Sequence, residues 1–262
     1  MGKQLAMVTG ASSGIGYNLA KVFAENGFDL VIASNGERLD TAEIDLKALG
    51  VQVTAVHTDL ATYDGIAELW KQVESLGRPV DAAAINAGVG VGGLFAETPL
   101  DKEINLVRLN VEGTVHLAKR IVQHMLPRKQ GRILITSSIA GEMVAPRESV
   151  YAASKAFDLS FGKSLREELE DTGVTVTVLQ PGPTDTDFFH RAGMDSTKTG
   201  QEGKKESSPY AVAKQGYEAL MKGEKHVYAA SLKTKFEGAV ANFVPDAVKA
   251  SMHEKMAKPL HH

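Results

Sequence analysis

Hydrophobic positions along the chain fall into short apolar runs that alternate with longer stretches in which apolar residues recur every three or four positions. The short runs are apolar or β-branched throughout, and they predict strands at Gln4–Thr9, Asp29–Ala33, Val51–Val56, Val80–Ile85, Arg132–Thr136, Val174–Leu179 and His226–Ala230. The longer stretches predict helices at Gly14–Asn26, Glu37–Leu49, Ile66–Leu76, Asp101–Leu126 and Val150–Asp171, with a further helix led by Pro209. Strands without polar alternation indicate a parallel sheet that is covered on both faces. The pattern therefore predicts an α/β fold, in which a doubly wound, mainly parallel sheet of about seven strands carries helices on both faces.

One segment, Asp187–Ser208, breaks this rhythm. It is rich in Gly, Lys, Ser and Thr and has little apolar periodicity. We interpret it as a substrate loop that forms a lid over an active site; a linker between domains is the alternative. The residues after it, including a C-terminal extension after about residue 231, are too few for an independent core. We therefore predict one domain over residues 1–262.

Composition narrows the possible functions. Hydrophobic residues make up 43% and charged residues 23% of the chain, as in an ordinary globular protein. A net charge of -3 argues against nucleic acid or an anionic membrane as a partner, and the absence of cysteine excludes disulfides and thiolate metal sites. The chain shows neither a leader segment nor an apolar run of about 18 residues, so we predict a cytoplasmic location. We interpret His261-His262 as the remnant of a tag rather than a metal site, and we expect no metal.

A glycine-rich turn follows the first predicted strand. Its residues are Gly10-Ala11-Ser12-Ser13-Gly14-Ile15-Gly16, and they lead directly into the first predicted helix. Glycines allow the backbone to turn tightly and to approach a pyrophosphate, and the free amides at a helix N-terminus favour an anion. Glycine is also an ordinary loop residue, but three glycines in this spacing at a strand–helix junction favour a dinucleotide site.

Four polar residues farther along carry candidate catalytic chemistry. Tyr151 and Lys155 stand four positions apart, so a helix places both on one face, where the ammonium would lower the phenol pKa from about 10. A chance pair on a helix surface is the alternative. Ser138 follows a predicted strand at the carboxyl edge of the sheet, where ligands bind in such folds, although a serine there also caps turns. Asn110 interrupts a helical pattern, which points either to a functional amide or to a local distortion of the helix.

Together with Asn86-Ala87-Gly88 after the fourth predicted strand, these motifs resemble the classical short-chain dehydrogenase/reductase (SDR) family. The Gly-x-x-x-Gly-x-Gly turn, the Asn-Ala-Gly triplet, Ser138 and Tyr151-Ala-Ala-Ser-Lys155 occur in the family's order over roughly residues 4–186. The resemblance implies a Rossmann-type fold and an NAD(P)(H)-dependent oxidoreductase that interconverts an alcohol and a carbonyl. It implies that Tyr151 transfers the proton, Ser138 binds the substrate oxygen and Lys155 holds the nicotinamide ribose. Asn110 would complete the proton relay through a water.

The resemblance also implies which residues contact the cofactor. The family's more usual Asn-Asn-Ala-Gly is here Ile85-Asn86-Ala87-Gly88, so the first asparagine is lost. Asp59, where the family contacts adenine, is equally compatible with a solvated turn. The implied cofactor contacts are Gly10, Ser12, Ser13, Gly14, Ile15, Gly16, Ser34, Asn35, Arg38, Asp59, Leu60, Asn86, Ala87, Gly88, Tyr151, Lys155, Pro181, Gly182 and Thr184.

The choice of cofactor depends on the end of the second predicted strand. Relatives that prefer NAD place an acid there, but this chain has Ser34, so the barrier to a 2′-phosphate is absent. Ser34, Asn35 and the turn hydroxyls could donate to a phosphate, with Arg38 as a counter-charge. The arginine usual in NADP-preferring relatives is missing at positions 34 and 35, and Arg38 is compatible with a solvated helix residue. We favour NADP(H), with NAD(H) as the alternative.

We expect a substrate pocket lined by Ala140–Ala145, Gly90–Phe95 and Asp187–Ser208, segments whose small and apolar residues indicate a modest apolar ketone or alcohol. The helices Asp101–Leu126 and Val150–Asp171 carry apolar residues beyond one stripe, so we expect a homo-oligomer, a tetramer or a dimer.

One alternative function is a non-catalytic dinucleotide-responsive binding protein. Another is a sugar-nucleotide epimerase or dehydratase, which shares Tyr-x-x-x-Lys but usually has a Gly-x-x-Gly-x-x-Gly turn and a longer C-terminal domain.

Overall fold

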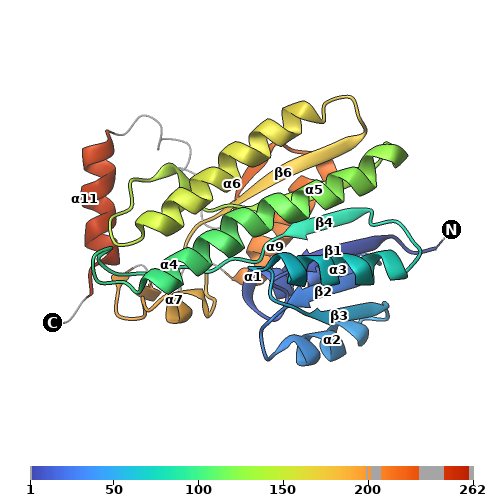
Figure 1. Cartoon of the computed structure of the whole chain (residues 1–262), viewed down its shortest axis with the longest axis horizontal. Coiled ribbons are helices and arrows are strands. Elements are labelled where there is room, and N and C mark those ends of the chain that lie inside the picture. Colours follow the sequence, from blue (N-terminus) through green and yellow to red (C-terminus); the bar gives the residue numbers. More distant parts are fainter. Residues whose placement is uncertain (1, 199, 202–207, 230–244, 260–262) are drawn as a thin grey trace.

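A seven-stranded sheet forms the centre of the protein in a computed structural model (Figure 1), which describes residues 2–198, 200–201, 208–229 and 245–259. The strand order is β3-β2-β1-β4-β5-β6-β7, and every neighbouring pair runs parallel. This confirms the doubly wound, Rossmann-type α/β fold expected from the sequence. The strands are β1 Leu5–Thr9, β2 Asp29–Ser34, β3 Val53–His57, β4 Ala82–Ile85, β5 Gly131–Thr136, β6 Val174–Pro181 and β7 His226–Ala229.

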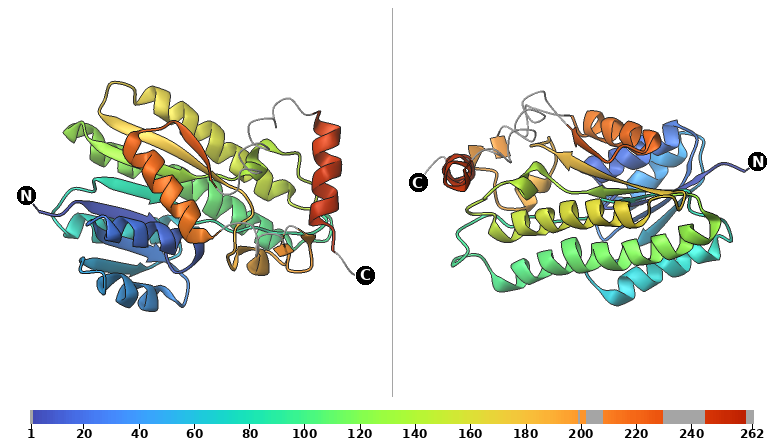
Figure 2. Two further views of the ribbon diagram at one scale, coloured as in Figure 1. Left: turned by 180° about the vertical axis from the view of Figure 1, so that it is seen from behind. Right: turned by 90° about the horizontal axis from the view of Figure 1, so that it is seen from above.

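Two hydrophobic cores, one on each face of the sheet, explain why the strands lack polar alternation. In β2, Leu30 and Ile32 belong to one core while Val31 and Ala33 belong to the other, since successive side chains point to opposite faces. The first core is covered by α1 Gly14–Glu25, α2 Leu39–Lys47 and α9 Pro209–Lys222. The second is covered by α3 Tyr63–Ser75, α5 Thr114–Met125 and α6 Ser149–Glu168, and Figure 2 shows α5 and α6 side by side on that face.

The long helix predicted over Asp101–Leu126 is present, but it is not uniform. It begins as α4 Leu100–Val107, passes through a π-helical segment at Arg108–Gly113 and continues as α5. The π-helical segment contains Asn110, and the Thr114 hydroxyl donates to the Asn110 carbonyl oxygen at 2.8 Å. A wider turn places residues differently around the axis, and such segments often occur at functional sites. The distortion expected at this asparagine is therefore confirmed.

Two elements lie at the carboxyl end of the sheet. The predicted loop Asp187–Ser208 contains a short helix, α7 Phe188–Arg191, and Thr197 forms an isolated bridge with Pro259. A second helix, α11 Asp246–Ala257, stands at the same end of the molecule (Figure 1). Residues 199 and 202–207 of the loop, most of the extension after residue 231, Ala230 and His261-His262 lie outside the described residues. Within the described part of the chain, no helix is long and apolar enough to cross a membrane.

Candidate active site

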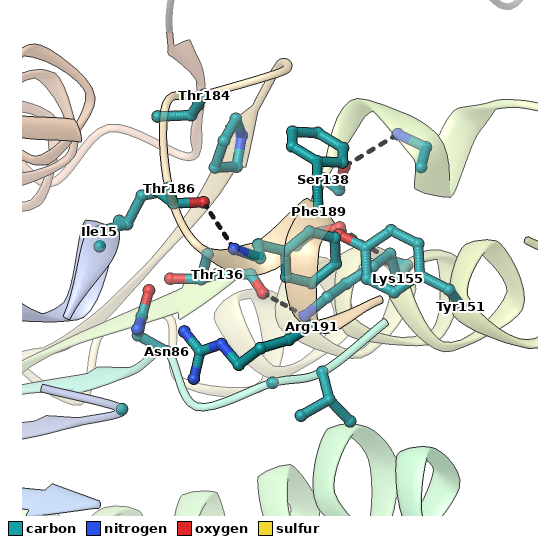
Figure 3. Close-up of a pocket in the computed structure, with 18 of the residues that line it drawn as sticks. Ile15, Asn86, Thr136, Ser138, Tyr151, Lys155, Thr184, Thr186, Phe189 and Arg191 are labelled. Carbon is teal, nitrogen blue, oxygen red and sulfur yellow. Dashed lines mark hydrogen bonds between the residues drawn. The ribbon is translucent and has the colours of Figure 1, made fainter. Parts of the chain in front are cut away.

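A cavity of about 570 Å³ opens at the carboxyl ends of the central strands (Figure 3). It lies where the chain departs from β1 toward one face and from β4 toward the other, which is the position expected for a ligand in this fold. Residues predicted from the sequence dominate its lining, whereas Arg38 and Asn110 do not line it. Those that do are Gly10, Ser12, Ser13, Gly14, Ile15, Gly16, Ser34, Asn35, Asp59, Leu60, Asn86, Ala87, Gly88, Ser138, Tyr151, Lys155, Pro181, Gly182 and Thr184.

The glycine turn has the conformation needed to bind an anion. Gly10 has φ +68°, and a Cβ on it would lie 2.9 Å from the Ala87 Cα, so the position requires glycine. Ser13 caps α1 with an extended backbone, yet its side chain makes no capping hydrogen bond and the first turn of α1 contains no acidic residue. The amides at this helix end are therefore available to a pyrophosphate, and the turn fits a dinucleotide.

Thr9 joins the ends of β1 and β4 on which the turn rests. Its Oγ1 accepts hydrogen bonds from the backbone amides of Asn86 at 3.0 Å and Ala87 at 3.1 Å. The Asn86 side-chain amide returns a bond to the Thr9 carbonyl oxygen at 3.2 Å. Ile85, at the position of the family's first asparagine, is buried in the second core. Asn86, the asparagine that this chain retains, thus fixes the ends of β1 and β4. The family's first asparagine is replaced by Ile85, an apolar core residue.

The structure distinguishes Ser138 from its neighbour Ser137. Ser137 also lines the cavity, but its hydroxyl is engaged, since it donates to the Lys155 carbonyl oxygen at 2.7 Å. Ser138 lines the cavity, and its Oγ accepts from the Ala140 amide at 3.1 Å while it caps a short 3-10 helix, Ile139–Glu142. The capping role and the predicted site position are therefore compatible, because an accepting hydroxyl still has its proton to donate.

Tyr151 lies in the first turn of α6 and is 9% exposed. Burial raises the pKa of its phenol, the hydrogen bond with Ser138 lowers it, and the negative charges of Glu148 and Asp158 raise it further. The Phe188 ring of α7 packs 5.2 Å from the Tyr151 ring. The phenol is thus held in its protonated form between Ser138 and an apolar wall.

Lys155 lies one turn after Tyr151, as its spacing predicts. Its ammonium donates to the Thr136 carbonyl oxygen at 2.9 Å and to the Asp158 carboxylate at 2.9 Å. Gly88 lies directly opposite, since a Cβ on it would be 3.5 Å from the Lys155 Nζ. The ammonium therefore sits between two strand ends and the helix, next to the cavity.

Asn110 lies next to the segment after β4 and to Lys155, and it is fully buried. Its amide group donates to the Val89 carbonyl oxygen and accepts from the Val89 amide, both at 3.0 Å. It also donates to the Ser154 hydroxyl at 3.0 Å. A Cβ on Gly88 would come within 3.2 Å of the Asn110 Oδ1. Asn110 thus fixes the segment after β4 against α6, beside Lys155.

Two arginines lie near the glycine turn, and the sequence indicated only one of them. Arg38 forms an ion pair with Asp187 at the start of the predicted lid. Arg191, on α7, lines the cavity and donates to the Ser13 hydroxyl at 3.1 Å. Arg191 also donates to the Asp187 carbonyl oxygen at 3.5 Å, so both arginines contact Asp187, and burial and the charge of Arg38 lower the pKa of Arg191. The sequence showed only that the lid segment contains a basic residue, Arg191. It could not show that Arg191 contacts Ser13, which lies 178 positions away.

The lining of the substrate end corrects one prediction. Within the described residues, Gly90–Phe95 does not line the cavity, because side chains of the lid segment cover it. A Cβ on Gly90 would meet the Phe188 ring at 2.6 Å, and one on Gly92 would meet Met194 at 2.4 Å. The segment Ala140–Ala145 contributes Ala140 and Met143. The predicted segment Asp187–Ser208 contributes Phe188, Phe189, Arg191 and Lys198. The residues that sequence reasoning missed include Thr58, Thr136, Thr186, Lys249, Met252, His253, Lys255 and Met256.

Helix α11 is attached to the start of α6 by polar contacts. His253 contacts the buried Glu148 carboxylate at 2.8 Å, and the His253 side chain itself is only 11% exposed. The Arg147 guanidinium donates to Glu254 at 2.9 Å, and the Lys249 ammonium donates to the Glu142 carbonyl oxygen at 3.3 Å. These contacts hold α11 across the mouth of the cavity. No group of His, Asp or Glu residues that could hold a metal is found in the part of the chain that the structure describes.

Known proteins share this architecture and these motifs. The family model described as short chain dehydrogenase matches residues 4–197. Oxidoreductase UcpA of Salmonella typhimurium is 34% identical over 187 residues, which cover 70% of this chain and 71% of that protein. The 1-deoxy-11-beta-hydroxypentalenate dehydrogenase of Streptomyces exfoliatus is 37% identical over 185 residues, which cover 69% and 67% of the two chains.

Solved structures are similar over most of the chain. A short-chain dehydrogenase from Sphingobium yanoikuyae, solved with NADPH, is 27% identical with a TM-score of 0.79 and covers 86% of this chain and 87% of its own. A short chain dehydrogenase/reductase from Burkholderia phymatum, solved with NAD, has a TM-score of 0.83 at 24% identity and covers 99% and 98% of the two chains. With the glycine turn, Asn-Ala-Gly and Tyr-x-x-x-Lys motifs at one cavity, the chain belongs to the short-chain dehydrogenase/reductase family and is an NAD(P)-dependent oxidoreductase.

Proposed function

We propose that the protein interconverts an alcohol and a ketone or aldehyde, with NADP(H) as the favoured cofactor. The observation that carries this proposal is that Ser138, Tyr151 and Lys155 meet in one cavity, which continues to the glycine turn Gly10–Gly16. A phenol, a hydroxyl and an ammonium are the groups needed to move one proton and to hold one oxygen atom.

Each of these residues has a role that its contacts support. When bound, the nicotinamide supplies the hydride in reduction and accepts it in oxidation. Tyr151 donates its hydroxyl proton to the carbonyl oxygen in reduction, and its phenolate takes the alcohol proton in oxidation. Ser138 donates a hydrogen bond to the same oxygen, where negative charge develops. Lys155, beside the cavity, would hold the ribose hydroxyls and, as a cation, would favour the Tyr151 phenolate, and Asn110 would complete the proton relay beside it.

We propose a modest apolar ketone or alcohol as substrate. The cavity wall next to Tyr151 is built from Phe188, Phe189, Met143, Met252 and Met256, which offer apolar surface and flexible thioethers. The dehydrogenase of Streptomyces exfoliatus described above is named for a hydroxypentalenate substrate. The bulk of this wall comes from α7 and α11, so these two helices would set the size of substrate that the protein accepts.

Several contacts support NADP(H). Ser34 ends β2 without a carboxylate, and its hydroxyl lies 3.0 Å from the Ser12 hydroxyl, so no acid at this point repels a 2′-phosphate. Arg191 contacts Ser13 of the turn, both Arg191 and Arg38 contact Asp187, and a phosphate dianion beside the two cations would relieve their repulsion. The relative from Sphingobium yanoikuyae, and a polyketide ketoreductase that is also 27% identical, were both solved with NADPH.

The test is a titration of NADPH and NADH into the purified protein at the same salt concentration, followed by turnover with a panel of ketones, aldehydes and alcohols. We expect NADPH to bind more tightly, and S34D to weaken NADPH selectively by at least about tenfold because it introduces a repulsive charge. Ser75→Asp, exposed at the end of α3, is the matched control and should leave both affinities unchanged.

Tighter binding of NADH would overturn the preference. Cofactor binding without turnover of any compound would favour a non-catalytic dinucleotide-responsive protein.

We also propose a cytoplasmic homo-oligomer, a dimer or a tetramer. On α4 and α5, Leu100 is 71%, Ile104 43% and Val115 39% exposed. The half-buried rings of Phe157 and Phe161 stack on the surface of α6 at 5.6 Å. Apolar side chains that recur on neighbouring helices of one face support an interface between copies of the chain.

A further inference from the structure

Asp158 is a buried carboxylate to which the proposed mechanism gives no role. It lies on α6, three residues after Lys155, and its side chain is 2% exposed. Its Oδ2 accepts a hydrogen bond from the Lys155 ammonium at 2.9 Å. The Lys155 side chain is 6% exposed, so little solvent screens the attraction between the two charges. The cation assigned to the cofactor ribose and to Tyr151 thus has a counter-ion of its own.

The surroundings of Asp158 make it dependent on Lys155. Burial raises the pKa of the Asp158 carboxyl above its usual value, and the Lys155 ammonium offsets part of that rise. The Thr114 hydroxyl also lies beside the carboxyl, but it has one proton and donates it to the Asn110 carbonyl oxygen at 2.8 Å. Within the described residues, the Asp158 Oδ1 atom is left without a hydrogen-bond partner. A buried carboxylate with so few donors is stabilised mainly by its cation, and it neutralises that cation in return.

Tyr151 experiences the negative charge of Asp158. Asp158 lies seven residues after Tyr151, two turns along the same helix face, and its negative charge opposes ionisation of the phenol. Burial and Glu148, which pairs with His253, act in the same direction. The other charged side chains that line the cavity come from α11, from the segment after β6 and from the turn after β3, and they are Lys249, Lys255, Arg191, Lys198 and Asp59.

We propose that Asp158 is a positioning residue that acts through Lys155: it holds and neutralises the ammonium, and so keeps Tyr151 protonated and able to donate to a carbonyl oxygen at neutral pH. This inference rests on the proposed function. An ammonium without a counter-ion would favour the phenolate, which accepts a proton from an alcohol. Asp158 therefore favours carbonyl reduction near neutral pH, and its removal extends alcohol oxidation to lower pH.

The test is the pH profile of alcohol oxidation by wild type and by D158N, which keeps the size of the side chain and removes its charge. Charges about two helix turns (~10 Å) apart at an effective dielectric constant of about 20 shift a pKa by about one unit. We expect the midpoint of the profile to fall by about one pH unit in D158N, and the reduction activity to decline at a correspondingly lower pH. D158E, which keeps the charge, should retain the wild-type midpoint.

Asp29→Asn provides the matched control. Asp29 is likewise buried and pairs with a cation, Arg78, at 2.6 Å. It lies at the amino end of β2, whereas the cavity lies at the carboxyl ends of the strands. D29N should lose stability and keep the wild-type midpoint. An unchanged midpoint in D158N would overturn the proposal, because a purely structural role predicts lower activity at every pH. If D158N does not fold, Asp158→Ser supplies the neutral side chain.

A second measurement separates this inference from the proposed function. Ultraviolet difference titration follows ionisation of Tyr151 directly when the signal of the Y151F variant is subtracted, and it needs no turnover. If wild type turns over no alcohol or carbonyl, the proposed function fails, while a lower Tyr151 midpoint in D158N by absorbance still supports the coupling to Asp158. Equal absorbance midpoints in the two proteins would overturn the coupling whether or not the enzyme is active.

Discussion

At the scale of single residues, the protein places one transferable proton in an apolar, buried setting. The Tyr151 hydroxyl has Ser138 on one side and the Phe188 ring on the other, and burial raises its pKa. A water molecule at this position would not supply a proton donor held in the same orientation as the Tyr151 hydroxyl. The proposed chemistry therefore depends on an atom that can be deleted with almost no change of shape.

Replacing Tyr151 by Phe should lower kcat by at least about two orders of magnitude and leave cofactor affinity close to that of wild type, because only the proton is lost. Single-turnover kinetics and a cofactor titration measure the two quantities. Tyr217→Phe is a suitable control, since Tyr217 packs edge-on against Phe23 and Phe28 in the first core. Turnover by Y151F near the wild-type rate would exclude Tyr151 as the proton donor.

Lys155→Met should reduce both cofactor affinity and kcat, because one ammonium serves the ribose and the phenol. It should also destabilise the protein by about 3 kcal/mol, since Asp158 is left buried without its cation. The double variant K155M/D158N removes that unpaired charge and should recover most of the stability without recovering turnover. Urea unfolding and steady-state kinetics on the three proteins test this; a double variant as unstable as K155M would show that the pair is not coupled.

Sequence reasoning located residues whose role follows from local spacing. Tyr151 and Lys155 share a helix face, and Ser138 follows a strand, so their proximity could be predicted. Arg191 could not be found in this way, because its contact with Ser13 joins segments that only the complete fold brings together. The exchange of hydrogen bonds between Asn110 and Val89 likewise depends on the path of the chain after β4.

At the scale of elements, the strands and most helices followed from hydrophobic periodicity because each buries an apolar stripe or face. Helix α11 gave no such signal. Its contacts with the start of α6 are polar, Ala257 alone joins a small apolar cluster with Ala192 and Met194, and the sequence of Asp246–Ala257 mixes Lys, Glu, Asp and His with small residues and methionines. A helix held mainly by polar side chains of distant segments has little apolar period that the sequence can display.

His253→Ala should release α11 from the site, since it removes the contact with Glu148. We expect KM for the carbonyl substrate to rise about tenfold, with kcat changed by less than about threefold, because the helix contributes substrate wall rather than the proton path. Val248→Ala, on the exposed side of the same helix, should leave both constants unchanged. A fall in kcat at unchanged KM in H253A would contradict this role for α11.

At the scale of the whole molecule, helices α4, α5 and α6 lie together on the face of the second core (Figure 2), and Leu100, Ile104 and Val115 of α4 and α5 are exposed. Ile104→Glu places a charge among them and should shift an oligomer toward monomer, because a buried unpaired carboxylate is costly. Sedimentation velocity at micromolar concentration measures the state. Ile44→Glu is the control, since Ile44 is 68% exposed on α2 at the opposite face. A wild-type monomer under these conditions would refute the proposed assembly.

The position of β1 between β2 and β4 has a consequence for synthesis on the ribosome. β1 is made first, yet its register with β4 pairs Ala6 with Ala82, so one edge of the first strand stays open until that later strand has emerged. The Asn86 and Ala87 amides that fix Thr9 arrive later still. A nascent chain that ends before β4 thus contains the whole glycine turn and its contacts with β2, such as the bond from the Gly10 amide to the Ala33 carbonyl oxygen, but lacks the contacts with the end of β4. The turn therefore reaches its final shape only once about a third of the chain has been made, and until then one edge of the first strand is open to other partners.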